Sequence, residues 1–102
     1  MLEKTIETKL KKTIEGLGHG VICAKLESPG MTGMPDRLVL LPGGRVIFVE
    51  LKAPGKHEKA RQVYIQDKLR ELGFEVFSTV RTPEQVEAIR ARCAELIDHA
   101  EI

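Results

Sequence analysis

The sequence predicts an α/β fold in which a mixed sheet is flanked by helices, and three observations support this expectation. Apolar residues recur three or four positions apart at both ends of the 102-residue chain and in one central stretch, as in amphipathic helices. Short runs rich in β-branched residues lie between these stretches. Pro42-Gly43-Gly44 is turn chemistry between two such runs and predicts an antiparallel hairpin. We expect one domain over residues 1–102, with a core of about 3–80 and a C-terminal helix of about 83–98.

The first half of the chain is expected to hold one helix and three strands. Residues 1–17 have the helical spacing of apolar side chains, at Leu2, Ile6, Leu10, Ile14 and Leu17, and three nearby glycines end the helix. Residues 20–27 (GVICAKLE) are expected to form a strand, which Ser28-Pro29-Gly30 breaks. The two strands of the hairpin follow as Arg37–Leu41 and Arg45–Leu51.

The second half is expected to add a helix, a strand and a final helix. Residues 58–72 predict a helix that Gly73 closes, with its core side chains at Val63, Ile65, Leu69 and Leu72. Residues 74–80 (FEVFSTV) predict the next strand. Thr82-Pro83-Glu84 combines an N-cap residue, a proline and an acid, which is typical of a helix start. The apolar stripe of this last helix consists of Val86, Ile89, Cys93, Leu96 and Ile97.

Charge and composition narrow the classes of function. The net charge of +1 argues against a protein that holds nucleic acid by bulk electrostatics alone, but residues 1–81 carry +4 and residues 82–102 carry −3. Apolar runs are far shorter than the roughly 18 residues of a membrane span, and the N-terminus lacks the apolar region of a signal peptide. We therefore expect a cytoplasmic protein that makes no membrane contact, with Cys23 and Cys93 as reduced thiols.

The end of the hairpin carries charged residues where apolar strands rarely tolerate them. Asp36 opens the first strand, and Glu50 and Lys52 share one face of the second because side chains alternate along a strand. If the turn is the three-residue loop 42–44, Asp36 lies opposite Glu50, with Cβ atoms roughly 5 Å apart. A two-residue loop would instead move Asp36 to the other face. Paired carboxylates predict a Mg²⁺ or Mn²⁺ site, and Lys52 lies beside it, as a metal-assisted phosphodiester hydrolase requires.

This arrangement resembles the PD-(D/E)xK nuclease superfamily and, more narrowly, its VRR-NUC branch. The narrower resemblance rests on Ser28-Pro29-Gly30, Gly33-x-Pro35-Asp36-Arg37, Val49-Glu50-x-Lys52 and Arg61-Gln62, and it spans roughly residues 3–80. It implies the restriction-endonuclease-like αβββαβ core, to which this chain adds a C-terminal helix. It also implies a Mg²⁺- or Mn²⁺-dependent DNA endonuclease of a stand-alone, phage-type kind, acting in a bacterial or phage-infected host cell. Single-domain members look like homodimers that act on branched DNA such as four-way junctions.

The resemblance also assigns roles around the hairpin. Asp36, Glu50 and the carbonyl of Leu51 are the expected metal ligands, and Lys52 positions or deprotonates the attacking water. A glutamate of the first helix completes the metal site, and Glu7 matches better than Glu3. From the residues alone, Glu7 is slightly better explained as an edge carboxylate that reaches solvent or pairs with Lys11. Gln62 belongs to the motif and is expected to hydrogen-bond the site or the attacking water.

The segment after the hairpin is expected to contact DNA. Lys56, Lys59 and Arg61 place positive charge next to Lys52, which favours phosphate contacts over a merely solvated loop. Gly55-Lys56 lacks the lead and the Ser or Thr of a P-loop, so no nucleotide cofactor is expected. Two rival readings stay open at this point: a nucleic-acid-binding module with a degenerate nuclease site, and a structural α/β domain with a surface ion-pair cluster.

Overall fold

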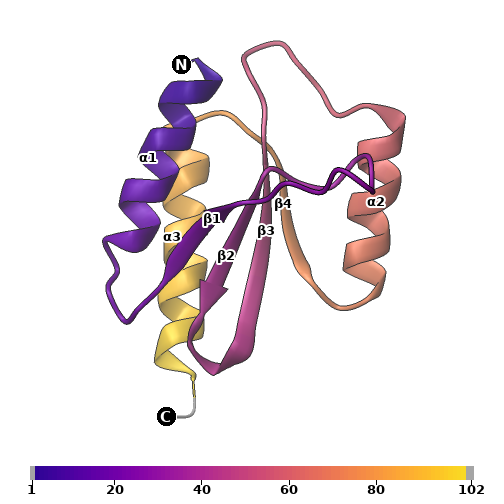
Figure 1. Ribbon diagram of the computed structural model, residues 1–102. Coiled ribbons are helices and arrows are strands. Elements are labelled where there is room, and N and C mark those ends of the chain that lie inside the picture. Colours follow the sequence, from indigo (N-terminus) through magenta and orange to yellow (C-terminus); the bar gives the residue numbers. More distant parts are fainter. Residues whose placement is uncertain (1, 101–102) are drawn as a thin grey trace.

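The structure is a computed structural model that describes residues 2–100, and its elements follow the expected order (Figure 1). They are α1 (Glu3–Glu15), β1 (Ile22–Lys25), β2 (Arg37–Leu41), the one-turn 3₁₀ helix η1 (Pro42–Gly44), β3 (Arg45–Leu51), α2 (Ala60–Glu71), β4 (Glu75–Val80) and α3 (Pro83–Asp98). The observed bounds differ from the predicted ones by a few residues at most, because the ends of elements are the least specified part of a sequence pattern. No helix within residues 2–100 is long and apolar enough to cross a membrane.

The sheet is mixed, as predicted, with the strand order β1-β2-β3-β4. β1 pairs with β2 and β2 with β3 in antiparallel fashion, whereas β3 and β4 run parallel. The hairpin turns through the three residues of η1, so Leu41 pairs with Arg45 and Arg37 with Val49. The three-residue alternative is therefore the correct one, and Asp36 and Glu50 follow as the next positions along the two strands.

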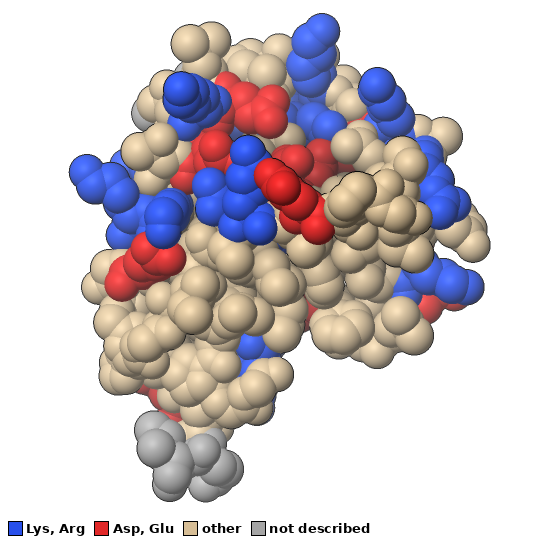
Figure 2. Space-filling view, viewed as in Figure 1, with Lys and Arg blue, Asp and Glu red and all other residues tan. Residues whose placement is uncertain are grey.

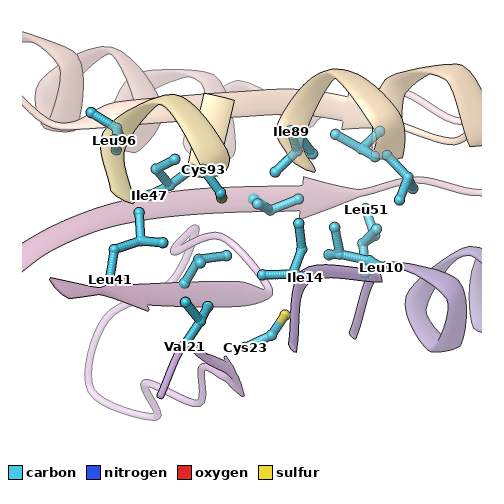
Figure 3. Close-up of a cluster of buried hydrophobic side chains, with 14 of the residues drawn as sticks. Leu10, Ile14, Val21, Cys23, Leu41, Ile47, Leu51, Ile89, Cys93 and Leu96 are labelled. Carbon is cyan, nitrogen blue, oxygen red and sulfur yellow. The ribbon is translucent and has the colours of Figure 1, made fainter. Parts of the chain in front are cut away.

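Helices cover the two faces of the sheet unequally. Figure 1 shows α1 and α3 side by side on one face and α2 on the other. The larger core lies under α1 and α3, where Leu10 and Ile14 of α1 and Ile89 and Cys93 of α3 meet Ile47 of β3 (Figure 3). A smaller core under α2 is built on Phe48, Ile65 and Leu69. Every predicted apolar residue of α3 is buried.

The predicted core of α2 is wrong at two positions. Ile65 and Leu69 are buried, but Val63 is 45% exposed and Leu72 is 69% exposed. Residue 63 lies about 200° around the helix from residue 65, so both cannot face the sheet. Leu72 is the C-cap and lies beyond the last turn. Gln66, which is 2% exposed, takes a buried position instead, so the sheet-facing side of α2 is partly polar.

Candidate active site

Asp36 and Glu50 lie next to each other where β2 begins and β3 ends. Pro35 and Asp36 directly precede β2, and the register of the hairpin, in which Arg37 pairs with Val49, sets the next residues Asp36 and Glu50 beside each other. Each accepts a backbone hydrogen bond from the other strand: the N–H of Leu51 donates to Asp36 Oδ2 at 2.9 Å, and the N–H of Asp36 donates to Glu50 Oε1 at 3.2 Å. These reciprocal bonds hold both side chains in place.

Glu50 is buried, with 1% of its surface exposed. Burial raises the pKa of Glu50 to about 7, and the nearby charge of Asp36 acts in the same direction against the opposing hydrogen bond from Lys52. The charged form of this carboxyl group is therefore less favoured than that of a carboxyl group in water. A group of this kind is easily deprotonated when a cation arrives, because the cation stabilises the charged form.

Lys52 and Gln62 complete a hydrogen-bonded triangle around Glu50. Lys52 Nζ lies 2.8 Å from Glu50 Oε2 and donates to Gln62 Oε1 at 3.1 Å, while Gln62 Nε2 donates to Glu50 Oε2 at 3.0 Å. Burial lowers the pKa of Lys52, but the hydrogen bond and charge of Glu50 outweigh burial and raise it above its usual value. The ammonium group thus stays charged and fixed beside the carboxylate pair.

Gln62 is fixed at the start of α2. Besides Lys52, its Oε1 accepts a hydrogen bond of 2.8 Å from the N–H of Lys59, the N-cap residue of this helix. Since helix N-termini leave backbone N–H groups without partners, a side chain that accepts one of them also stabilises the helix. The same amide therefore ties the first turn of α2 to Glu50.

Glu7 lies apart from this group. It forms an ion pair with Arg37, whose Nη2 is 3.4 Å from Glu7 Oε2 and whose Nη1 donates to the carbonyl of Cys23. Among the residues that the structure describes, no three or more His, Cys, Asp or Glu side chains gather in a way that could hold a metal ion. The structure thus brings Asp36 and Glu50 together without Glu7 or Glu3, and a metal role for Glu7 stays a prediction.

The expected DNA-contact residues lie on the segment from the end of β3 to the start of α2. Lys56, Lys59 and Arg61 are all exposed. Arg61 is also part of the loop packing: its Nε donates to the carbonyl of Thr32, and its guanidinium lies 5.2 Å from the ring centroid of Tyr64. Figure 2 shows blue and red side chains gathered in the upper part of the molecule, the end at which β3 finishes, above a largely uncharged lower front.

Two neighbours of the site were not singled out by the sequence. Glu58 accepts hydrogen bonds from both the N–H and the hydroxyl of Thr79. Gln66, one turn after Gln62, accepts a hydrogen bond from Ser78. The spacing offered a signal for Gln66, which lies four positions after Gln62 on the same side of α2, whereas Glu58 precedes the helix. Their partners in β4, however, depend on a parallel pairing that no local pattern specifies.

An α/β domain with a mixed sheet, a central hairpin and an Asp…Glu-x-Lys group at its end has the restriction-endonuclease-like fold. A scan against protein-family models gives no match. A solved structure described as a VRR_NUC domain is similar to this chain with a TM-score of 0.74 and 31% sequence identity, covering 97% of both chains. The chain is also 43% identical over 74 residues to p44, a candidate nuclease of Acyrthosiphon pisum secondary endosymbiont phage 1, covering 72% of this chain and 77% of that protein.

These similarities extend over most of each chain, one to a VRR_NUC domain and the other to a nuclease. The chain therefore belongs to the VRR-NUC family of nucleases. The fold expected from the sequence is confirmed, including the mixed sheet and its flanking helices.

Proposed function

We propose that this nuclease is a Mg²⁺- or Mn²⁺-dependent DNA endonuclease whose active site is the group Asp36, Glu50, Lys52 and Gln62. The observation that carries the proposal is the reciprocal pairing of Asp36 and Glu50, in which each carboxylate accepts a backbone hydrogen bond from the other strand, with the charged Lys52 at 2.8 Å from Glu50. A merely structural ion pair needs no second carboxylate at this place, since a like charge beside a buried one is unfavourable.

The donor atoms suit a hard divalent cation. Asp36 and Glu50 supply carboxylate oxygens, and the Leu51 carbonyl belongs to the residue between Glu50 and Lys52. Mg²⁺ and Mn²⁺ prefer such oxygen ligands and keep several waters, so two or three protein ligands are enough. Glu7 is proposed as a further ligand, directly or through water, which requires it to leave Arg37. A bound cation would lower the pKa of a water and neutralise charge on the scissile phosphate.

The protein side chains then have separate tasks. Lys52 is proposed to position the attacking water and to stabilise the negative charge that develops on the phosphate. Its ammonium group, with a raised pKa, has no free electron pair with which to accept a proton from that water. The amide of Gln62 hydrogen-bonds both the ammonium of Lys52 and Oε2 of Glu50. These two bonds fix the distance between the ammonium group, where the attacking water is expected, and the carboxylate pair. Fixed donors of this kind act without reorganising during the reaction.

The proposed substrate is branched DNA, such as a four-way junction, cut by a homodimer. Lys56, Lys59 and Arg61 are exposed beside the site and suit contacts to the phosphate backbone. One copy of 102 residues offers little surface for gripping a duplex, whereas two copies related by a twofold axis would cut two strands symmetrically. Exposed apolar side chains on the paired strands β1 and β2 and beyond α2 support an interface: Ile22, Leu40, Leu72 and Phe74.

Cleavage assays test the proposal. Labelled linear duplex, flap and four-way-junction DNA would be incubated with Mg²⁺, Mn²⁺ or EDTA. Asp36→Asn and Lys52→Ala should abolish cutting while leaving the unfolding transition in place, and Lys68→Ala, at an exposed lysine of α2, should cut like the wild type. Symmetric junction nicks and a dimer in light scattering would support the resolvase form. Cutting that persists in EDTA would contradict metal dependence, and junction binding without any cutting would favour the degenerate binding module.

Metal binding can be measured without cleavage. Mn²⁺ should raise the melting temperature of the wild type, because a ligand that binds only the folded state stabilises it. Asp36→Asn should lose this rise. Glu7→Gln should weaken it if Glu7 is a ligand, while Glu3→Gln serves as the matched control in the same helix. A rise that survives in Asp36→Asn would exclude the carboxylate pair as the site.

A further inference from the structure

The pairing of β3 with β4 is irregular directly beside Glu50. Val49 pairs with Phe77 and Leu51 with Val80, so the two residues Ser78 and Thr79 face the single residue Glu50. This is a β-bulge, in which the strand with the extra residue bends and re-aims its neighbours. The bulge therefore lies at the one point of the sheet where the candidate active site begins.

Thr79 adopts an unusual backbone conformation in this bulge. Its φ is +54°, in the left-handed region that β-branched residues rarely occupy. The surrounding structure must hold such a residue in place, because a strained conformation persists only where its neighbours over-determine it. Strain of this kind clusters at functional sites, and Thr79 lies beside Glu50 of the candidate active site.

Three side-chain contacts hold Thr79. Glu58 Oε2 accepts from the N–H of Thr79 at 2.7 Å, and Glu58 Oε1 accepts from its hydroxyl at 2.6 Å. Gln85 Nε2 donates to the carbonyl of Thr79 at 3.0 Å. All the hydrogen-bonding groups of this one residue are thus engaged by side chains from the loop before α2 and the first turn of α3. We call Glu58, Thr79 and Gln85 the bulge clamp.

The clamp connects to Lys52 through one backbone bond. The N–H of Lys52 donates to the carbonyl of Val80 at 3.0 Å, and Val80 directly follows Thr79. Lys52 lies just past the end of β3, so this bond anchors its backbone to the sheet. If Thr79 relaxed to an ordinary extended conformation, the carbonyl of Val80 would turn away and Lys52 would lose the anchor.

We infer that Glu58 is a positioning residue of the active site: by holding Thr79 in its left-handed conformation, it fixes the Val80 carbonyl and thereby the backbone of Lys52. This inference rests on the proposed nuclease function of Lys52. Glu58 itself touches no reacting atom in this account. Its carboxylate affects the position of Lys52, beside which the attacking water is expected. A small displacement of Lys52 lowers the rate of cleavage, because the water and the phosphate must be aligned.

A rescue experiment separates positioning from simple stabilisation. Glycine adopts positive φ without strain, so Thr79→Gly should keep the bulge even when Glu58 is removed. Four proteins would be compared in single-turnover cleavage of junction DNA: wild type, Glu58→Ala, Thr79→Gly and the double variant. Glu71→Ala, at an exposed carboxylate near the end of α2, is the matched control, and Glu58→Gln replaces Glu58→Ala if the latter does not fold.

Glu58→Ala should slow cleavage by about 10- to 100-fold while the DNA dissociation constant changes less than about 2-fold. The double variant should return to within about 3-fold of Thr79→Gly, since a coupled pair does not lose activity additively. A double variant as slow as Glu58→Ala would overturn the inference, and so would an unchanged rate in Glu58→Ala.

Amide hydrogen exchange provides a second readout that needs no cleavage. Protection of the Lys52 N–H should fall in Glu58→Ala and return in the double variant, because the bond to Val80 reports the bulge directly. If the wild type cuts no DNA, the proposed function fails, and this exchange result alone decides whether the clamp holds Lys52. Unchanged protection in Glu58→Ala would overturn the inference whether or not the protein is active.

Discussion

Replacing Glu50 by glutamine should change how stability depends on pH in the metal-free protein. Glu50 is 1% exposed, and burial raises its pKa from 4.5 to about 7. The pKa of Glu50 is higher in the folded state than in the unfolded state, so between pH 4.5 and pH 7 the folded state binds more protons. The contribution of protonated Glu50 to the free energy of unfolding is therefore fully present below pH 4.5 and is lost as the pH rises through 7. With ~1.4 kcal/mol for each pKa unit, ionising Glu50 in the folded protein costs about 3 kcal/mol above pH 7.

Urea unfolding in EDTA between pH 4.5 and pH 8 measures this cost. The free energy of unfolding of Glu50→Gln minus that of the wild type should rise by about 3 kcal/mol across the range. Taking the difference cancels the groups that do not interact with Glu50, such as Glu58, where hydrogen bonds from Thr79 outweigh burial and lower the pKa. Glu71→Gln controls for the loss of one carboxylate from the surface. A difference that stays constant with pH within about 0.5 kcal/mol would refute this account of Glu50.

Two further substitutions test local structures near the candidate site, the close approach of the chain at Gly33 and the N-cap of α3. Gly33→Ala should lower the free energy of unfolding by about 1–3 kcal/mol, because φ at Gly33 is +98° and a Cβ there would lie 2.8 Å from the carbonyl oxygen of Arg61. Gly30→Ala, with nothing within 4 Å, is its control in the same urea assay, and equal losses would contradict the close-approach argument. Thr82→Ala should cost about 1 kcal/mol through loss of the α3 N-cap bond to Gln85, whereas an unchanged melting curve would contradict that capping role.

The central pair of the candidate site follows from local sequence in all steps but one. The period of two along a strand put Glu50 and Lys52 on one face, and the length of the turn then fixed which residue lies opposite Glu50. The choice between a two- and a three-residue loop was the only open step, and the observed pairing of Leu41 with Arg45 decides it. A hairpin is predictable in this way because its partners are close in sequence.

Features that depend on distant partners were not predictable. The bulge at Thr79 arises from the parallel pairing of β3 with β4, which lie on opposite sides of α2 in the sequence. From the sequence alone, Glu58 was therefore interpreted only as one negative charge in a basic loop. Likewise, helical geometry placed Glu7 at the edge of the apolar stripe, but its partner Arg37 lies on another element and is fixed only by the fold.

The sheet-facing side of α2 is partly polar where it covers the candidate active site. A helix that covers a sheet normally buries apolar side chains, yet α2 directs Gln62 and Gln66 toward β3 and β4. The sheet beneath it carries Glu50 and Ser78, and buried polar groups need hydrogen-bond partners. A fully apolar face on α2 would leave Glu50 without one of its partners and raise the cost of its charge further. The polar side of α2 thus matches polar groups of the sheet, with Gln62 bonded to Glu50 in β3 and Gln66 bonded to Ser78 in β4. The apolar pattern of this helix is therefore weakest beside the candidate active site.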